Sequence, residues 1–238
     1  GSPSSVKIEN FGEFRLKDIT LISSLPDMGR VGGLVTEHIA QNIGAKISAK
    51  VVLTDKPWVE LKDGIIEMPF DEYKLLVDEK SSLVIFTGEN QPQEPAMVFE
   101  LVNFVIDTVQ KWGNIKRIIS TGGYMPMQKT DGDSVYCVAT DQDTLDEMKS
   151  YGIKQLGGDV KSITWFNGLV LGIAKLKKIP GIGLFGEIYD AENPQHRAAK
   201  NIIEKIEKMI NISIGTTELK EKILEKPVET KKDGPGIG

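Results

Sequence analysis

The chain has 238 residues, of which 40% are hydrophobic and 26% are charged, and these fractions are typical of soluble globular domains. Its formal net charge of −5 argues against a nucleic-acid-binding protein, because such proteins usually carry a basic surface. A single cysteine excludes an intramolecular disulfide, so we expect a reducing, cytoplasmic location.

Short runs of β-favouring residues alternate along the chain with longer helical patterns. This alternation predicts a three-layer α/β fold, with a mostly parallel sheet covered by helices on both faces. The predicted strands are Ile19–Ser23, Ala49–Leu53, Leu83–Thr87, Lys116–Thr121, Val135–Ala139 and Ile182–Glu187. A further pair of runs, Gly64–Met68 and Tyr73–Asp78, is interpreted as a hairpin or an edge feature around Pro69.

The predicted helices show apolar residues at helical spacing. They cover residues 31–43, 94–112, 143–151, 165–176, 195–210 and 217–226. In the helices at 94–112 and 165–176 the apolar residues spread around most of the circumference, which favours deep burial or contact within an oligomer. No apolar run reaches the roughly 18 residues of a membrane span, so we expect no membrane partner.

The chain divides into three predicted parts. Residues 1–5 are interpreted as a tag remnant, Gly1-Ser2, and a disordered start. Residues 6–214 are predicted to form a single α/β domain. Residues 215–238 are predicted to form a C-terminal helix and a mobile tail, because the last part is charged and rich in Gly and Pro.

A glycine-rich turn joins the first predicted strand to the first predicted helix. Gly29, Gly32 and Gly33 could let the backbone and the helix N-terminus bind an anion, with Arg30 adding a charged fork. The same glycines could instead let the helix lie close to the sheet, and we favour this interpretation. Neither the dinucleotide-binding fingerprint nor the Walker pattern fits the spacing of these glycines.

Two further turns and one carboxylate are predicted to lie at the same edge. Gly88, Glu89 and Gln91 follow one strand, Thr121, Gly122 and Gly123 follow another, and Glu187 ends a third. The carboxyl ends of parallel strands meet at one edge of a sheet, where ligands of such folds bind. These residues, with those of the glycine-rich turn, are the candidate ligand-binding set.

Beyond this set, the sequence shows few residues suited to catalysis or metal binding. No nucleophile with a base and no metal-ligand spacing stands out, and Cys137 is predicted to be a small buried residue within a strand. We therefore expect no catalytic residue, no metal and no cofactor, and we lean towards a protein that is not an enzyme.

The order of several short segments resembles the proteasome assembly chaperone 2 family in its archaeal form. The segments are Leu25–Gly33, Leu83–Pro92, Arg117–Gly123, Phe166–Gly172 and Gly181–Glu187, with Asn193-Pro194 and Ala198-Ala199 beyond them. Each segment is only loosely specific, but their order covers about residues 19–219, which is nearly the whole domain.

The resemblance implies a fold like that of nucleoside phosphorylases and hydrolases, in a protein that forms homo-oligomers. It also implies a proteasome assembly chaperone or a proteasome-binding factor, with the α-subunits of the 20S proteasome as partners. Some relatives dock through a C-terminal tail with a penultimate tyrosine, whereas this sequence reads Pro235-Gly236-Ile237-Gly238. Some archaeal relatives are classed as ATP-grasp-like enzymes, but the carboxylates and lysines of such a nucleotide site are not evident here.

Two functional hypotheses follow. The first is a non-enzymatic, homo-oligomeric proteasome assembly chaperone or proteasome-binding protein. The alternative is an enzyme or sensor that binds a nucleoside or phosphate at the strand carboxyl ends, with Arg30 and Gly29 holding the anion and Glu89 or Glu187 as acid or base.

Overall fold

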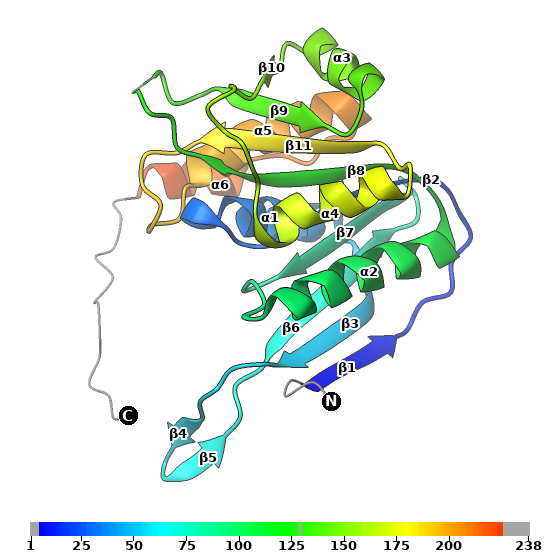
Figure 1. The fold of residues 1–238 in the computed structure, drawn as a ribbon, viewed down its shortest axis with the longest axis vertical. Helices are drawn as coiled ribbons and strands as arrows, with labels where there is room; N and C mark the ends of the chain where they lie inside the picture. The colour runs from blue at the N-terminus through cyan, green and yellow to red at the C-terminus, as the bar shows by residue number, and fades with distance from the viewer. Residues whose placement is uncertain (1–4, 129, 226–238) are drawn as a thin grey trace.

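A nine-stranded sheet forms the centre of the protein (Figure 1). The computed structural model describes residues 5–128 and 130–225. In spatial order the strands are β1 (Ser5–Asn10), β3 (Lys46–Thr54), β6 (Asp71–Asp78), β7 (Leu83–Gly88), β2 (Leu16–Ser23), β8 (Gly113–Tyr124), β11 (Gly181–Glu187), β9 (Val135–Ala139) and β10 (Lys154–Gln155). The α/β class predicted from the alternating pattern is confirmed.

The sheet is mixed, so the expectation of a mostly parallel sheet is wrong. The central strands β7, β2, β8 and β11 are parallel, whereas β1, β3 and β6 pair antiparallel, as do β6 with β7 and β9 with β11. Residues 79–82 alone connect β6 to β7, and so short a connection cannot cross over to a parallel neighbour.

The predicted pairing of Gly64–Met68 with Tyr73–Asp78 is also wrong. Strand β6 joins the main sheet between β3 and β7. The hairpin lies one step earlier, between β4 (Glu60–Lys62) and β5 (Ile65–Glu67), which form a separate two-stranded sheet. Asp63 and Gly64 form its turn with φ of 51° and 79°, as Asp-Gly turns of this kind require.

Helices cover both faces of the main sheet (Figure 1). They are α1 (Val31–Ile43), α2 (Pro95–Trp112), α3 (Gln142–Ser150), α4 (Trp165–Leu176), α5 (His196–Ile210) and α6 (Thr217–Ile223), with a 3-10 turn η1 (Met28–Arg30) before α1. Helices α2 and α4 pack together over one face, and α1 and α5 pack together over the other. Residues 226–238, which include the mobile tail predicted at 231–238, lie outside the described residues, as do residues 1–4 of the predicted start.

Two hydrophobic clusters fill the space between the layers. One contains the inward side chains of α2 and α4, from Val98 to Trp112 and from Phe166 to Ala174. The other contains those of α1 and α5, together with Leu219 of α6. The wide apolar stripe of α2 is therefore buried within its own chain, and packing inside one copy explains it.

Candidate functional site

A pocket of about 550 Å³ lies at the carboxyl edge of the central strands. Its walls come from the turn after β2, the end of β8, and residues 156–167, which lead into α4. Its polar lining includes Asp27, Gln91 and Asn167. A volume of this size suits a small organic ligand or a few side chains of a partner.

The turn that leads into α1 has an unusual backbone. Gly29 and Arg30 both lie in the left-handed region, with φ of 65° and 57°, and this region is costly for a residue with a side chain. Two hydrogen bonds hold Gly29, because its N–H donates to the carbonyl of Ala191 and its carbonyl accepts from the N–H of Gln195. The loop before α5 therefore fixes the conformation of the turn.

Gly32 sits where the first turn of α1 approaches the sheet. A Cβ atom at this position would lie 2.5 Å from the carbonyl oxygen of Leu25 and 2.9 Å from that of Thr121. Real Cβ atoms do not approach backbone oxygen so closely, so only glycine fits without a shift of the backbone. Close packing is a sufficient physical reason for this glycine.

Two amide side chains hold the strand-to-helix turn from the opposite side. The Asn167 side chain accepts the N–H of Leu25 at 2.7 Å and donates to the carbonyl of Leu25 at 2.8 Å. The Gln91 side chain donates to the carbonyl of Pro26 at 3.1 Å and accepts the N–H of Phe166 at 3.3 Å. The turn is thus bound to the start of α4 by two direct hydrogen bonds of Asn167 and by the bridge through Gln91.

Asp27 places a carboxylate at the N-terminus of α1. One oxygen accepts the N–H of Gly32 at 2.9 Å, and the other accepts the N–H of Gly123 at 2.7 Å. Burial raises the pKa of Asp27 from 3.8 to about 6, although these backbone hydrogen bonds act in the opposite direction. The carboxyl group therefore titrates close to neutral pH while it lines the pocket.

This carboxylate has a consequence for the proposed anion site. A phosphate at the helix N-terminus would need the backbone N–H groups of the first turn. The chain's own carboxylate already binds the N–H of Gly32 and that of Gly123. A negatively charged ligand at the same place would also meet the charge of Asp27, so the geometry disfavours phosphate there.

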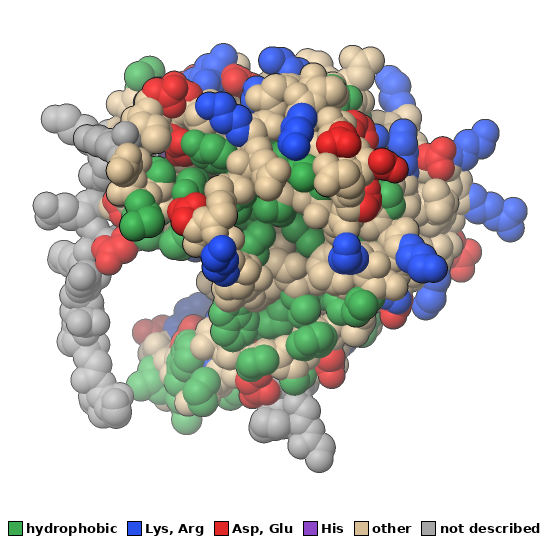
Figure 2. Space-filling model, turned by 45° about the horizontal axis from the view of Figure 1, so that its top comes forward, with side chains coloured by type: hydrophobic (Ala, Val, Ile, Leu, Met, Phe, Trp, Pro, Cys, Tyr) green, Lys and Arg blue, Asp and Glu red, His purple; other side chains and the backbone are tan. Residues whose placement is uncertain are grey.

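The rest of the pocket wall is largely apolar. The side chains are contributed by η1, the segment after β8, the start of α4 and the inner face of β11, and they are Met28, Met125, Met127, Trp165 and Phe185. All except Phe185 are more than 40% exposed. In Figure 2, hydrophobic side chains reach the surface in the middle of the face shown. Methionine side chains are flexible and adapt to varied apolar partners.

The structure brings only part of the predicted set to this pocket, namely Gln91 and Gly123. The guanidinium of Arg30 donates to the carbonyl of Glu89 at 3.2 Å, and Gly88 and Glu89 line a different hollow.

Other residues of the predicted set also lie in surroundings that differ from the expectation. Thr121, Gly122 and Gly123 lie within β8, so the expectation of a turn there is wrong. Gly33 packs against the ring of Pro26.

Glu187 lies in a separate polar cluster. It ends β11 and is buried, and its carboxylate accepts hydrogen bonds from the hydroxyls of Tyr136 (2.6 Å) and Thr130. The hydrogen bond to Glu187 is the main cause of a raised pKa at Tyr136. Glu187 does not line the pocket that contains Asp27.

Sequence reasoning missed the residues that shape the pocket most. Asp27 and Asn167 were visible inside the turn and the α4 segment, but their contacts join residues far apart in the sequence. An aspartate just before a glycine-rich helix start, five residues before Gly32, is the one local signal that could have identified Asp27.

Within residues 5–128 and 130–225, no group of three or more His, Cys, Asp or Glu side chains is placed to hold a metal ion. Cys137 is buried, as predicted, and burial raises the pKa of its thiol. In the same part of the chain, no helix has the length and apolar character needed to cross a membrane.

Known proteins share both the sequence pattern and the fold. The PAC2 family matches residues 21–226. An uncharacterized protein of Methanocaldococcus jannaschii, MJ1210, is 28% identical over 215 residues, which are 87% of this chain and 80% of that protein.

Two solved structures from Pyrococcus furiosus are similar across nearly the whole chain. PbaB, an archaeal proteasome activator, is 26% identical with a TM-score of 0.77, over 91% of this chain and 93% of PbaB. PbaA, an archaeal homolog of proteasome-assembly chaperone, is 20% identical with a TM-score of 0.74, over 91% of this chain and 87% of PbaA. The likeness to PbaA concerns the fold alone.

Proposed function

Since the chain belongs to the PAC2 family, we propose that it is a non-enzymatic, homo-oligomeric protein of the cytoplasm that binds the α-subunits of the 20S proteasome. The family resemblance inferred from the ordered segments is confirmed by the match over residues 21–226. The similarity to PbaB, a proteasome activator, is the observation that carries the proposal. The role is that of an assembly chaperone or an activator.

The geometry of the carboxyl edge supports a binding role over catalysis. The polar groups there bind one another: Asp27 binds Gly32 and Gly123, and Asn167 binds Leu25. Groups engaged in this way stabilise a rigid surface, whereas a catalytic group must reach a substrate. The exposed methionines and Trp165 beside them offer apolar contact area, which suits a protein partner.

Co-elution with proteasome subunits tests the proposal directly. The full chain is mixed with purified α-subunits and with assembled 20S proteasome, and each mixture is separated by size at low and at physiological salt. We expect the chain to elute with at least one of them. Failure to co-elute with either at both salt concentrations would contradict the proposal.

A second measurement separates the two proposed roles. An activator raises the rate at which assembled 20S proteasome cleaves a fluorogenic peptide. An assembly chaperone instead raises the yield of assembled particles from free subunits and leaves the cleavage rate of mature particles unchanged. An effect in neither assay, despite co-elution, would exclude both roles.

The alternative is a small ligand in the Asp27 pocket, and the pocket's volume favours it. Asp27 and Gln91 could bind the hydroxyls of a neutral nucleoside more readily than a phosphate, because Asp27 is itself an anion. Thermal-shift measurements with nucleosides, nucleotides and inorganic phosphate test it, with Arg30→Ala as the variant for anion binding. No shift with any of these compounds would end this alternative.

A further inference from the structure

The β4–β5 hairpin projects from the sheet and carries apolar side chains that its own chain leaves exposed (Figure 1). We call residues 57–68 the arm. Its exposed apolar residues are Trp58, Val59, Leu61, Ile65, Ile66 and Met68, and their exposed fractions run from 46% to 73%. Figure 2 shows the arm as a green group at the lower left.

The two faces of the hairpin differ in character. Leu61 pairs with Ile66 across the two strands, so these two side chains share one face. Glu60 pairs with Glu67 and Lys62 pairs with Ile65, so the charged residues share the other face with Ile65. One face is therefore apolar and exposed, while the opposite face is mostly charged.

Such a hairpin is too small to be stable alone. Each strand has only three residues, and an isolated two-stranded hairpin is marginally stable in water without a third strand or a packed face. Its base is nevertheless fixed, since Lys56 binds the buried carboxylate of Asp71 at 2.9 Å, and Asn90 donates to the same oxygen. The arm is thus held out from the body with its apolar face uncovered.

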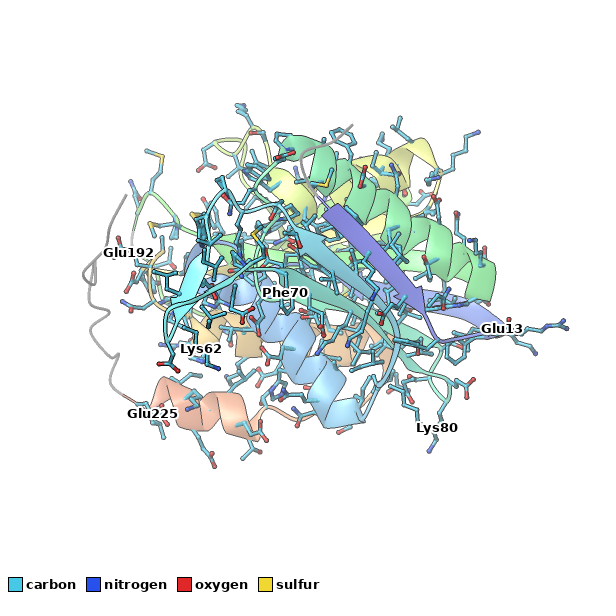
Figure 3. All side chains as sticks on the ribbon, turned by 90° about the horizontal axis from the view of Figure 1, so that it is seen from below. Glu13, Lys62, Phe70, Lys80, Glu192 and Glu225 are labelled. Atoms are coloured by element: carbon cyan, nitrogen blue, oxygen red, sulfur yellow. The ribbon has the colours of Figure 1, made fainter. Side chains whose placement is uncertain are left out.

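A hollow of about 420 Å³ lies beside the base of the arm. Its apolar lining includes Ala40 of α1, Ile47 of β3 and Leu76 of β6, together with Phe70 between the arm and β6. Ile47 and Phe70 are 45% and 58% exposed. Figure 3 shows Phe70 close to α1 and Lys62 out on the arm. The rest of the lining is polar or glycine. Each copy therefore carries both a projecting apolar arm and a hollow that is partly apolar.

We propose that the arm of one copy packs its Leu61–Ile66 face into the hollow beside Phe70 of a second copy. The inference rests on the homo-oligomeric part of the proposed function and assigns the contact surface. An arm and a hollow on the same molecule are self-complementary, and this property defines the interfaces of symmetric homo-oligomers.

The available area agrees with an interface between copies. By strand alternation Val59 and Met68 lie on the same face as Leu61 and Ile66. Side chains of this size that are about half exposed each present roughly 100 Å², so these four on the arm, with Ile47 and Phe70 in the hollow, present roughly 600 Å² per copy. A stable interface buries about 800 Å² per partner. The arm and the hollow thus supply most of a standard interface without help from other surfaces.

The charges at the edges of this contact are also compatible. Lys62 makes no ion pair with any residue in the described part of the chain. Glu37, Glu72 and Glu89 line the hollow together with Lys74. Lys62 lies next to the turn of the arm, away from the Leu61–Ile66 face, so it is available at the rim of the contact, where a cation complements these glutamates.

Sedimentation velocity on the full chain tests the arm. The variant Leu61→Asp with Ile66→Asp places charges on the apolar face, and Leu176→Asp is the matched control, because Leu176 on α4 is 79% exposed and Leu61 is 73% exposed. We expect the arm variant to weaken self-association by about 100-fold or more, and the control to match the parent chain. Circular dichroism verifies that both variants are folded.

The outcomes separate this inference from the proposed function. If the parent chain assembles and the arm variant assembles equally well, or if Leu176→Asp is equally disruptive, the arm is not the interface. If the parent chain is a monomer at micromolar concentration, the homo-oligomer and the arm contact both fail, while proteasome binding is judged separately by co-elution. An arm variant that still assembles but no longer co-elutes with proteasome subunits would assign the arm to that partner instead.

A mixing experiment tests the proposed receptor surface. Ile47→Asp alters the hollow and leaves the arm intact. We expect it to weaken self-association by itself, and we expect an equimolar mixture with the arm variant to recover mixed assemblies, since one intact arm can meet one intact hollow. Failure of the mixture to assemble would contradict the pairing of arm with hollow.

Discussion

The carboxyl-edge pocket and the arm both show apolar side chains to solvent, but their surroundings differ. At the edge, Asp27 and Asn167 bind the backbone of the strand-to-helix turn, and Gly32 lets the helix touch the sheet. On the arm, Leu61 and Ile66 pair across the two strands, and their apolar face is exposed.

The carboxyl edge stabilises the fold of one copy, whereas the arm offers apolar surface for contact with another molecule. Changes at the edge remove buried hydrogen bonds or create overlaps within one copy, so they should lower the stability of the monomer. Changes on the arm remove surface that a monomer does not bury, so they should affect assembly and leave monomer stability nearly unchanged.

The largest expected effect comes from Asn167→Leu at the edge. The substitution leaves the buried N–H and carbonyl of Leu25 without their partners, and each such group costs about 1–3 kcal/mol. We expect the free energy of unfolding to fall by about 4 kcal/mol, measured by urea denaturation. The control is Asn114→Leu on an exposed site, and equal losses in the two variants would show that the edge hydrogen bonds are unimportant.

The next effect concerns Asp27 and pH. The pKa of Asp27 is about 6 in the folded chain, against 3.8 as the ordinary value of an aspartate side chain, so the folded state binds this proton more tightly than the unfolded state. Its contribution to stability is therefore present below pH 4 and is lost as pH rises to about 6, by about 3 kcal/mol in total.

Denaturation of the parent chain and of Asp27→Asn at pH 4 and pH 7 checks this sign. The variant has no titrating carboxyl group at this position. The free energy of unfolding of the parent chain should therefore fall relative to that of the variant as pH rises. A difference that is constant across this range would show that Asp27 has an ordinary pKa in the fold.

A smaller effect is expected for Gly32→Ala. The added Cβ would overlap the carbonyl oxygen of Leu25, and overpacking of this kind costs about 1–3 kcal/mol. Gly172→Ala in α4 is the control, because nothing lies within 4 Å of its Cβ position, and alanine favours a helix by about 1 kcal/mol. Urea denaturation should show opposite signs, and a stabilising Gly32→Ala would contradict the close approach.

The smallest effect on monomer stability is expected on the arm. Leu61→Ser changes a residue that is 73% exposed, so at a concentration where the chain is monomeric its free energy of unfolding should change by less than about 0.5 kcal/mol. A loss similar to that of Asn167→Leu would mean that the arm's apolar face is packed within its own copy.

Much of the fold was visible in local patterns. The helix spacing predicted α1, α2, α4 and α5 to within a few residues, and the apolar runs located six strands of the main sheet. The pairing of β6 was predicted wrongly because the hairpin turn was expected near Pro69. The turn lies at Asp63-Gly64, a typical turn sequence. Strand β1 was missed because most of its residues are polar or exposed.

The site was only partly predictable. Gln91 and Gly123 line the pocket at the carboxyl edge, because the ends of parallel strands converge there. Glu187 shares that edge but turns into its own cluster with Tyr136, and the position of a strand end cannot predict the direction of its side chain.

The sequence by itself determined the helices, six strands of the main sheet, the α/β class and the family, because apolar periodicity and ordered motifs are local properties of the chain. Only the tertiary structure decided that Asp27 binds the N–H groups of the glycine turn, and that the arm's apolar face has no cover within one copy. Both facts depend on residues distant in sequence. The N–H of Gly123 reaches Asp27 only after β2 and β8 pair, and the face of Leu61 is bare only because the rest of the chain packs elsewhere.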